Sequence, residues 1–244
     1  MRKLTQTNKP IHLLKNLIHG FLTLFYPHTC LLCVRELNQQ DEFMCFSCRS
    51  ELHFTYFEKY EEETVADEKF WGKYQIDNVY SLLYFEKGNS TQNILHQIKY
   101  KEGKGVGEYM GKLIGERIKD IEKYKSVDAI IPVPIHSKKK FSRGHNQSLI
   151  IAKGISQEMT INIADILKRV KNDASQTRKS KEERYENVKG KFAVKKNHTG
   201  PFNHVLIVDD VLTTGATLES VARTIRATFP NTKVSLATIA IAHK

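Results

Sequence analysis

The sequence has no run of about 20 apolar residues, the length that an α-helix needs to span a bilayer. The nearest approach is residues 11–26, where apolar residues recur at helical spacing but Lys15 and Asn16 interrupt them. Because no small-residue cleavage site follows, we expect this segment to be retained rather than removed as a signal peptide. It is predicted to be an amphipathic helix that packs on the neighbouring module, with peripheral membrane contact as a minor alternative.

Several common nucleotide-binding signals are also missing. The chain contains no G-x-G-x-x-G or Walker arrangement, no internal repeat and no low-complexity segment. The glycines at 103, 105 and 107 therefore favour a loop between two helices at least as strongly as a phosphate-binding turn. We give this glycine cluster little weight as a binding site.

Acidic residues are scarce relative to basic ones. Lys and Arg number 38 against 27 Asp and Glu, which gives a formal net charge of +11. A strongly basic chain favours polyanionic partners such as nucleic acid, phosphorylated substrates or an anionic membrane surface. The charge indicates partners and says nothing about the fold.

Cysteine is confined to one stretch, where two Cys-x-x-Cys pairs are separated by eleven residues: Cys30, Cys33, Cys45 and Cys48. Two such pairs bring four thiolates together, which suits tetrahedral zinc. A pair of disulfides is the alternative, but it requires an oxidising compartment and the chain shows no export signal. We therefore expect a structural Zn²⁺ site in a cytoplasmic protein, with contact at the inner face of the membrane as a minor option.

Composition divides the chain into three parts. Residues 1–57 hold the N-terminal helix and the four-cysteine module, residues 58–75 form a charged connection, and residues 76–244 form the main domain. In the main domain, strand patterns at 76–85 and 127–133 alternate with helical patterns at 90–99 and 110–121. This alternation predicts an α/β fold with a parallel sheet.

The most informative string is residues 205–218. Residues 205–208 read as a core strand, and Asp209 and Asp210 follow at its carboxyl end, where open α/β sheets place ligands. Two carboxylates can accept hydrogen bonds from the vicinal hydroxyls of a ribose. Residues 213–217 then offer hydroxyls, a flexible glycine and the backbone N–H groups of a helix start, which together favour a phosphate. Two aspartates alone would read as helix caps, but the complete string favours a ribose 5-phosphate site.

This string resembles the phosphoribosyl pyrophosphate (PRPP) motif of the type I phosphoribosyltransferases: a hydrophobic run, two acids and a Thr/Gly-rich loop. The resemblance implies that Asp209 and Asp210 hold the ribose hydroxyls and that Mg²⁺ accompanies the pyrophosphate of PRPP. It implies that the 5-phosphate is wrapped by Thr213, Thr214, Gly215, Ala216 and Thr217.

A second loop, residues 132–147, follows another predicted strand and should face the same crevice. Its four cations can neutralise a multiply charged anion, either pyrophosphate or DNA: Lys138, Lys139, Lys140 and Arg143. A solvated surface turn is the alternative for the lysines alone. The string Arg143-Gly144-x-Asn146-Gln147, the Pro-Val-Pro before it and the four-cysteine module together resemble the competence-associated ComF family over nearly the whole chain.

Residues 168–191 carry nine basic and four acidic residues and predict a long mobile loop. In the type I family the corresponding loop closes over PRPP, so the resemblance makes Arg178, Lys179 and Arg184 candidates to meet the leaving pyrophosphate. A solvated charged hairpin with no chemical role is the alternative.

Two functions follow from the ComF resemblance. The first is a competence protein in DNA uptake and natural transformation that binds single-stranded DNA, works with other uptake proteins and retains a PRPP pocket. The basic loops, with Phe141 and Tyr185 beside them, permit strand binding. The alternative is an active phosphoribosyltransferase that transfers the phosphoribosyl group of PRPP to a nucleobase-like acceptor. The expected fold is a type I phosphoribosyltransferase-like parallel sheet flanked by helices, with a small zinc-ribbon-like N-terminal module.

Overall fold

The computed structural model describes residues 29–38, 41–100, 103–135, 141, 144–170, 191–198 and 200–242. The chain divides into two compact units, Met1–Glu51 and Leu52–Lys244. The helix predicted for residues 11–26 lies outside the described residues. Within the described ranges, no helix is both long enough and apolar enough to cross a membrane.

The described part of the first unit is small. It contains one short helix, α2 (Phe46–Ser50), and an isolated antiparallel bridge between Thr29 and Glu36. A unit of this size buries little apolar surface and usually needs a disulfide or a metal ion for stability. All four cysteines of the chain lie in it.

The second unit is built on a parallel sheet of four strands in the order β1-β6-β5-β2. The strands are β1 (Asn78–Phe85), β2 (Ala129–Pro132), β5 (His204–Leu212) and β6 (Lys233–Ala242). The apolar residues 205–208 of β5 are completely buried, as expected for a central strand covered on both faces.

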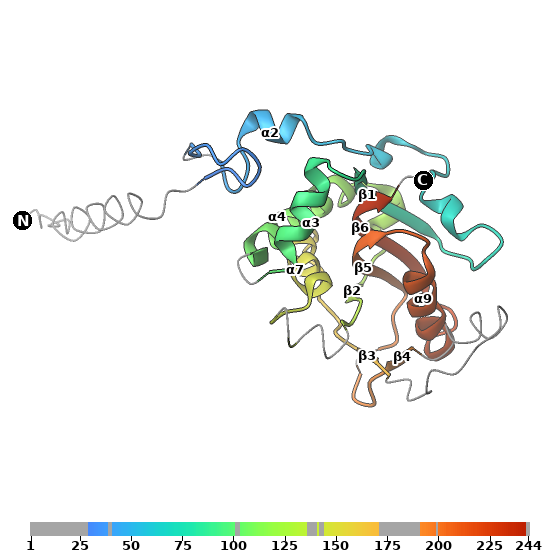
Figure 1. Ribbon diagram of the computed structural model, residues 1–244. Coiled ribbons are helices and arrows are strands. Elements are labelled where there is room, and N and C mark those ends of the chain that lie inside the picture. The colour runs from blue at the N-terminus through green and yellow to red at the C-terminus, as the bar shows by residue number, and fades with distance from the viewer. Residues whose placement is uncertain are drawn as a thin grey trace, which may run out of the picture. The chain divides into compact units, whose positions relative to one another are not determined.

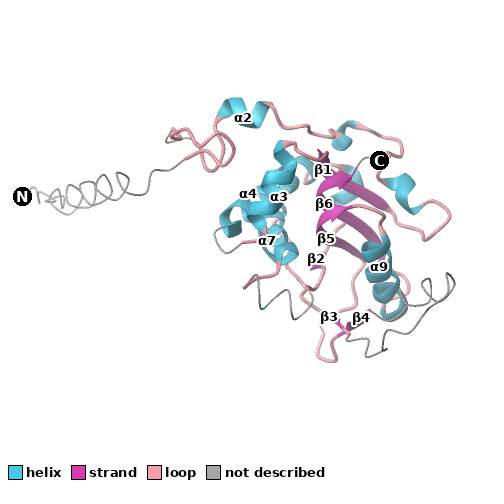
Figure 2. Ribbon diagram, viewed as in Figure 1, coloured by secondary structure: helices cyan, strands magenta, loops and turns pink. Residues whose placement is uncertain are grey.

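Helices cover both faces of this sheet. Helices α3 (Ser90–Ile98), α4 (Lys104–Ile118) and α7 (Gln147–Met159) lie on one side, and α9 (Ala216–Thr228) lies on the other (Figures 1 and 2). A short helix, α5 (Glu122–Lys125), precedes β2. Outside the main sheet, β3 (Leu167–Arg169) pairs antiparallel with β4 (Phe192–Val194). The predicted fold class is therefore confirmed.

Helices α4 and α7 cross at very close range because glycines face each other at the contact. A Cβ atom on Gly111 would lie 2.1 Å from the carbonyl oxygen of Ile151, and one on Gly154 would lie 2.0 Å from that of Glu108. The loop predicted at Gly103, Gly105 and Gly107 does separate two helices, α3 and α4, but it is shorter than expected. Gly103 precedes α4, which begins at Lys104 and already includes Gly105 and Gly107. A Cβ atom on Gly107 would lie 2.9 Å from the Ile150 side chain of α7.

The segment 58–75, expected as a charged connection, has parts that pack within the second unit. It contains a 3₁₀ turn (Asp67–Phe70), in which Phe70 is buried, and Ala66 before it is also buried. Glu58 pairs with Arg117 of α4 and accepts a hydrogen bond from the Tyr80 hydroxyl at 3.1 Å. The segment thus contains both charged side chains and apolar residues that belong to the core.

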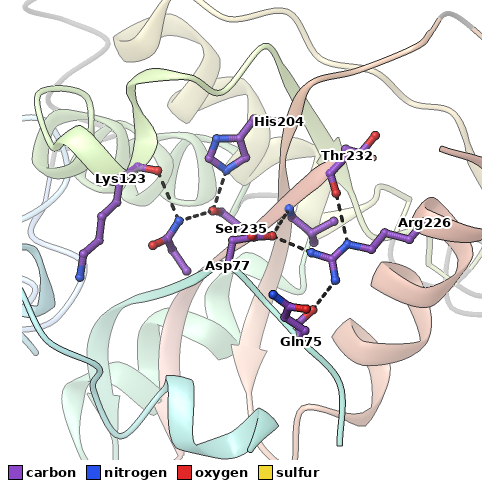
Figure 3. Close-up of polar contacts among 9 residues, drawn as sticks. Gln75, Asp77, Lys123, His204, Arg226, Thr232 and Ser235 are labelled. Carbon is purple, nitrogen blue, oxygen red and sulfur yellow. Dashed lines mark hydrogen bonds and ion pairs between the residues drawn. The ribbon is translucent and has the colours of Figure 1, made fainter. Parts of the chain in front are cut away.

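A polar network connects the amino ends of β1 and β6 to the carboxyl end of α9 (Figure 3). The guanidinium of Arg226 donates to the Asp77 carboxylate at 2.6 Å and to the backbone carbonyls of Gln75 at 2.5 Å and Thr232 at 3.2 Å. Asp77 in turn accepts from the backbone N–H of Val234 at 2.7 Å. One arginine thus satisfies three oxygens from two separate segments of the chain, residues 75–77 and Thr232.

Arg226→Ala is expected to lower the free energy of unfolding by about 2–3 kcal/mol, because the partly buried Asp77 carboxylate loses its cation and two carbonyls lose a donor. Arg226→Lys should recover only part of this loss, since an ammonium lacks the planar fork. Urea denaturation checks both variants. Lys233→Ala, at an exposed position on β6, is the matched control and should change stability by less than about 0.5 kcal/mol. Equal stability of Arg226→Ala and the control would contradict this account.

Candidate functional site

Two acids stand at the carboxyl end of β5, as the sequence predicts. Asp209 and Asp210 are each partly exposed, and both line a cavity of about 230 Å³. The other residues that line it come from α7, β3, α9 and two loops: Lys99, Val133, Pro134, Ile135, Asn146, Gln147, Ser148, Arg169 and Thr217. The cavity therefore presents carboxylates, amides and cations together.

Asp209 is held by hydrogen bonds from two neighbours. Its Oδ1 atom accepts from the Ser148 hydroxyl at 2.9 Å and from the backbone N–H of Asp210 at 3.0 Å. Burial raises the pKa of the Asp209 carboxyl to about 7, and the nearby Asp210 charge acts in the same direction. The two hydrogen bonds and the positive charge of Arg169 oppose this shift. Asp209 therefore changes its charge close to neutral pH.

The turn after β5 is built around a glycine. Gly215 precedes α9 with φ of +81°, a left-handed conformation that other residues rarely adopt. A Cβ atom there would also lie 2.9 Å from the ring of Phe70. Thr213, Thr214 and Ala216 are exposed, so the two threonine hydroxyls are accessible to a ligand. The backbone N–H of Ala216, the first of α9, donates to the Thr214 hydroxyl oxygen at 3.5 Å.

A further cavity of about 510 Å³ adjoins this turn. Thr213 and Thr214 line it together with Lys69 and Lys73, two cations from the segment before β1. The Lys69 ammonium donates to the carbonyl oxygen of Ala242 at 3.3 Å, at the carboxyl end of β6. The structure thus brings two lysines to the turn that the sequence predicts to hold a phosphate.

Several residues that line the cavity of the two acids were not predicted from the sequence. Ser148 follows the string Asn146-Gln147 directly and is the second residue of α7, so its position was a usable signal. Asn146 holds the loop through a hydrogen bond from Nδ2 to the carbonyl oxygen of Val133 at 3.0 Å. Arg169 lay within the basic segment 168–191, where nothing in the pattern distinguishes it from eight other cations.

The remaining predicted anion-binding residues lie outside the described part of the chain. These are Lys138, Lys139, Lys140 and Arg143 of the loop after β2, and Arg178, Lys179 and Arg184 of the segment between β3 and β4. Their assignments stay predictions.

The first unit holds a separate cluster formed by the four cysteines. Their Sγ atoms all lie within 4.8 Å of one another, and Cys33 and Cys45 are 3.7 Å apart. Four thiolates arranged tetrahedrally at about 2.3 Å from a zinc ion lie roughly 3.8 Å from each other. The four thiols are free rather than paired in disulfides. The cluster therefore fits a tetrahedral metal ion with no position left for substrate.

Comparison with known proteins first defines the class. Residues 145–244 match the family described as the phosphoribosyl transferase domain. This range includes α7, β5, α9 and β6, and with them Ser148, Asp209, Asp210 and the turn before α9. Residues 145–244 are therefore similar to a phosphoribosyl transferase domain, and the parallel sheet flanked by helices has the type I phosphoribosyltransferase-like fold.

More particularly, the chain is a homologue of competence protein F of Haemophilus influenzae, with 26% identity over 219 residues that cover 83% of this chain and 92% of the relative. DNA utilization protein YhgH of Escherichia coli O157:H7 is 26% identical over 134 residues, 53% of this chain and 58% of that protein. A solved glutamine PRPP amidotransferase from B. subtilis has a TM-score of 0.40 at 16% identity, covering 59% of this chain and 30% of its own. The predicted resemblance to the ComF family is confirmed.

Proposed function

We propose that this protein acts in DNA uptake during natural transformation, in the cytoplasm, by binding single-stranded DNA while keeping a pocket for PRPP. The names of its relatives, competence protein F and DNA utilization protein, support the biological role. The observation that carries the pocket is the pair of acids beside a glycine turn at the carboxyl end of β5.

In this proposal, Asp209 and Asp210 accept hydrogen bonds from the two ribose hydroxyls. The Thr213–Thr217 turn and the first N–H groups of α9 bind the 5-phosphate, with Lys69 and Lys73 neutralising its charge. The diphosphate lies toward Lys99 and Arg169, which line the same cavity as the acids. Mg²⁺ would enter bound to the diphosphate and reduce its negative charge.

The four-cysteine cluster is proposed to bind one structural Zn²⁺. Its support is the close approach of four free thiols in a unit too small to be stabilised by its apolar core. Because all four ligands come from the protein, we assign this metal to folding rather than to chemistry.

Phosphoribosyl transfer is the second candidate function, and one observation favours it. Asp209 has a pKa of about 7, which suits a group that exchanges a proton with a substrate at neutral pH. Incubation with PRPP, magnesium and a panel of nucleobases decides between the two functions. Release of pyrophosphate that depends on one base would show an enzyme, whereas strand binding without release would show a binding protein.

Single-strand binding is proposed to involve the loop after β2. Reversing the charges of Lys139 and Arg143 to Glu should weaken binding of an oligothymidylate about tenfold at 0.1 M salt and lower the salt slope by about 1.4. Fluorescence anisotropy over a salt series measures both effects. The double variant Lys119→Glu/Lys125→Glu changes the net charge by the same amount. Its two positions lie at the ends of α4 and α5, before β2, and it should have a much smaller effect. Equal loss in both double variants would exclude the loop as a specific contact.

A further inference from the structure

A larger, basic cavity lies beside the one that contains the acids. It measures about 610 Å³ and has one acidic residue, Asp165, among the described residues that line it. Its cations come from α4, α7 and the β3–β4 pair: Lys104, Lys153, Lys168, Arg169 and Lys195. The Asp165 carboxylate is already paired with Lys195 at 3.1 Å. The cavity therefore carries a net positive charge that a polyanion would neutralise.

Most of the remaining lining is apolar: Pro134, Ile135, Leu149, Ile150, Leu167 and Val170. Gly144, His145 and Asn146 complete it. A surface that combines cations with apolar contact area suits a single strand, whose phosphates and unstacked bases need both. A small anion such as inorganic phosphate would pair with the cations but make no contact with the apolar surface. These properties favour a short stretch of single-stranded DNA as the occupant.

The two cavities share part of their walls. Pro134, Ile135, Asn146 and Arg169 line both of them. Among the described residues, Arg169 is the only cation of the shared wall, and it ends strand β3 with its guanidinium 5.6 Å from the ring centroid of Phe192. An anion in either cavity therefore meets the same arginine.

We propose that the basic cavity binds a single DNA strand, and that the strand and PRPP weaken each other's binding because both depend on Arg169. This rests on the function proposed above for the two ligands. One guanidinium can pair fully with the phosphates of one ligand only, and a second polyanion nearby is repelled by the first. Linkage requires the effect to be reciprocal, so each ligand lowers the affinity of the other by the same factor.

The test titrates a fluorescent oligothymidylate at constant ionic strength with and without PRPP and magnesium, and repeats PRPP calorimetry with and without the oligonucleotide. Saturating PRPP is expected to weaken strand binding at least fivefold, within the usual range of coupling between sites. Arg169→Ala should weaken both ligands and reduce the coupling factor toward one. Lys153→Glu, exposed on α7 and lining only the basic cavity, should weaken the strand about tenfold and leave PRPP affinity within twofold.

The outcomes separate this inference from the proposed function. If both ligands bind but neither affects the other, or if PRPP strengthens strand binding, the coupling is overturned while the proposed function stands. If Lys153→Glu behaves like the control Lys125→Glu, the strand does not occupy the basic cavity. If no strand binds under any condition, both proposals fail. The double variant Asp209→Asn/Asp210→Asn, whose PRPP pocket should be disabled, checks that PRPP acts through its site and not through ionic strength.

Discussion

Asp209→Asn is expected to weaken PRPP binding about 10- to 100-fold, because a neutral amide replaces a carboxylate that accepts hydrogen bonds from the ribose. The double variant Asp209→Asn/Asp210→Asn should show no binding by calorimetry in the presence of magnesium. Both acids line the same cavity, and Asp209 is held in place by Ser148 and by the backbone of Asp210. In the proposed site the two acids therefore act as a single recognition element.

The same substitution should not destabilise the fold. The pKa of Asp209, about 7 in the folded chain, lies above its usual value near 4, so between these values the folded chain holds more protons than the unfolded chain. Stability therefore falls as the pH rises through this window, and the cost is complete above pH 7. Asp209→Asn removes this cost and is expected to raise the free energy of unfolding by on the order of 1 kcal/mol at pH 8, with a smaller gain at pH 5.

Urea denaturation at the two pH values separates loss of function from loss of structure. Asp120→Asn, at an exposed position after α4 and outside the cavity lining, is the matched control and should leave PRPP affinity and stability unchanged. Unchanged PRPP affinity in Asp209→Asn would refute the role of this acid. A large loss of stability would instead show that its carboxylate is mainly structural.

The parts of the fold that follow from local sequence were predictable. Strand β5 contains the apolar run 205–208 followed by two acids, and Gly215 comes after the strand, where the backbone has a positive φ. The helix of residues 90–99 has an asparagine before it, and Asn89 caps α3 by accepting from the backbone N–H of Gln92 at 3.2 Å. Each of these signals acts over a few residues and is therefore visible in a single sequence.

The parts that depend on distant contacts were not predictable. Gly105 and Gly107 read as a loop, yet they are helical because α4 packs closely on α7, about 45 residues later in the chain. Phe70 lies in a charged segment but is buried, and its ring lies against Gly215. Ser148 and Arg169 reach the acids only because a parallel sheet brings separate loops to one edge. No local pattern records such juxtapositions.

Removal of the proposed Zn²⁺ should unfold the first unit and leave the second unit folded. Its described residues form one five-residue helix and an isolated bridge, so the four thiolate–metal bonds are expected to supply most of its folding free energy. For structural zinc this contribution is about 10–16 kcal/mol in small peptides at pH 7. We therefore expect protein purified under reducing conditions to contain one zinc ion per chain, and Cys33→Ser to contain much less than one.

Hydrogen exchange gives the readout that distinguishes a local from a global effect. In Cys33→Ser, or after chelation, amides of residues 29–51 should lose protection, while those of β5 and β6 should keep it and PRPP affinity should stay unchanged. Ser47→Ala is the matched control, because Ser47 lies between Cys45 and Cys48 but offers no thiolate. Less than one zinc per chain in the unmodified protein would contradict the four-thiolate assignment. If the two units fold independently, loss of a metal bound by the first unit should not change the second. Simultaneous loss of protection in β5 would therefore show that the metal also stabilises the second unit.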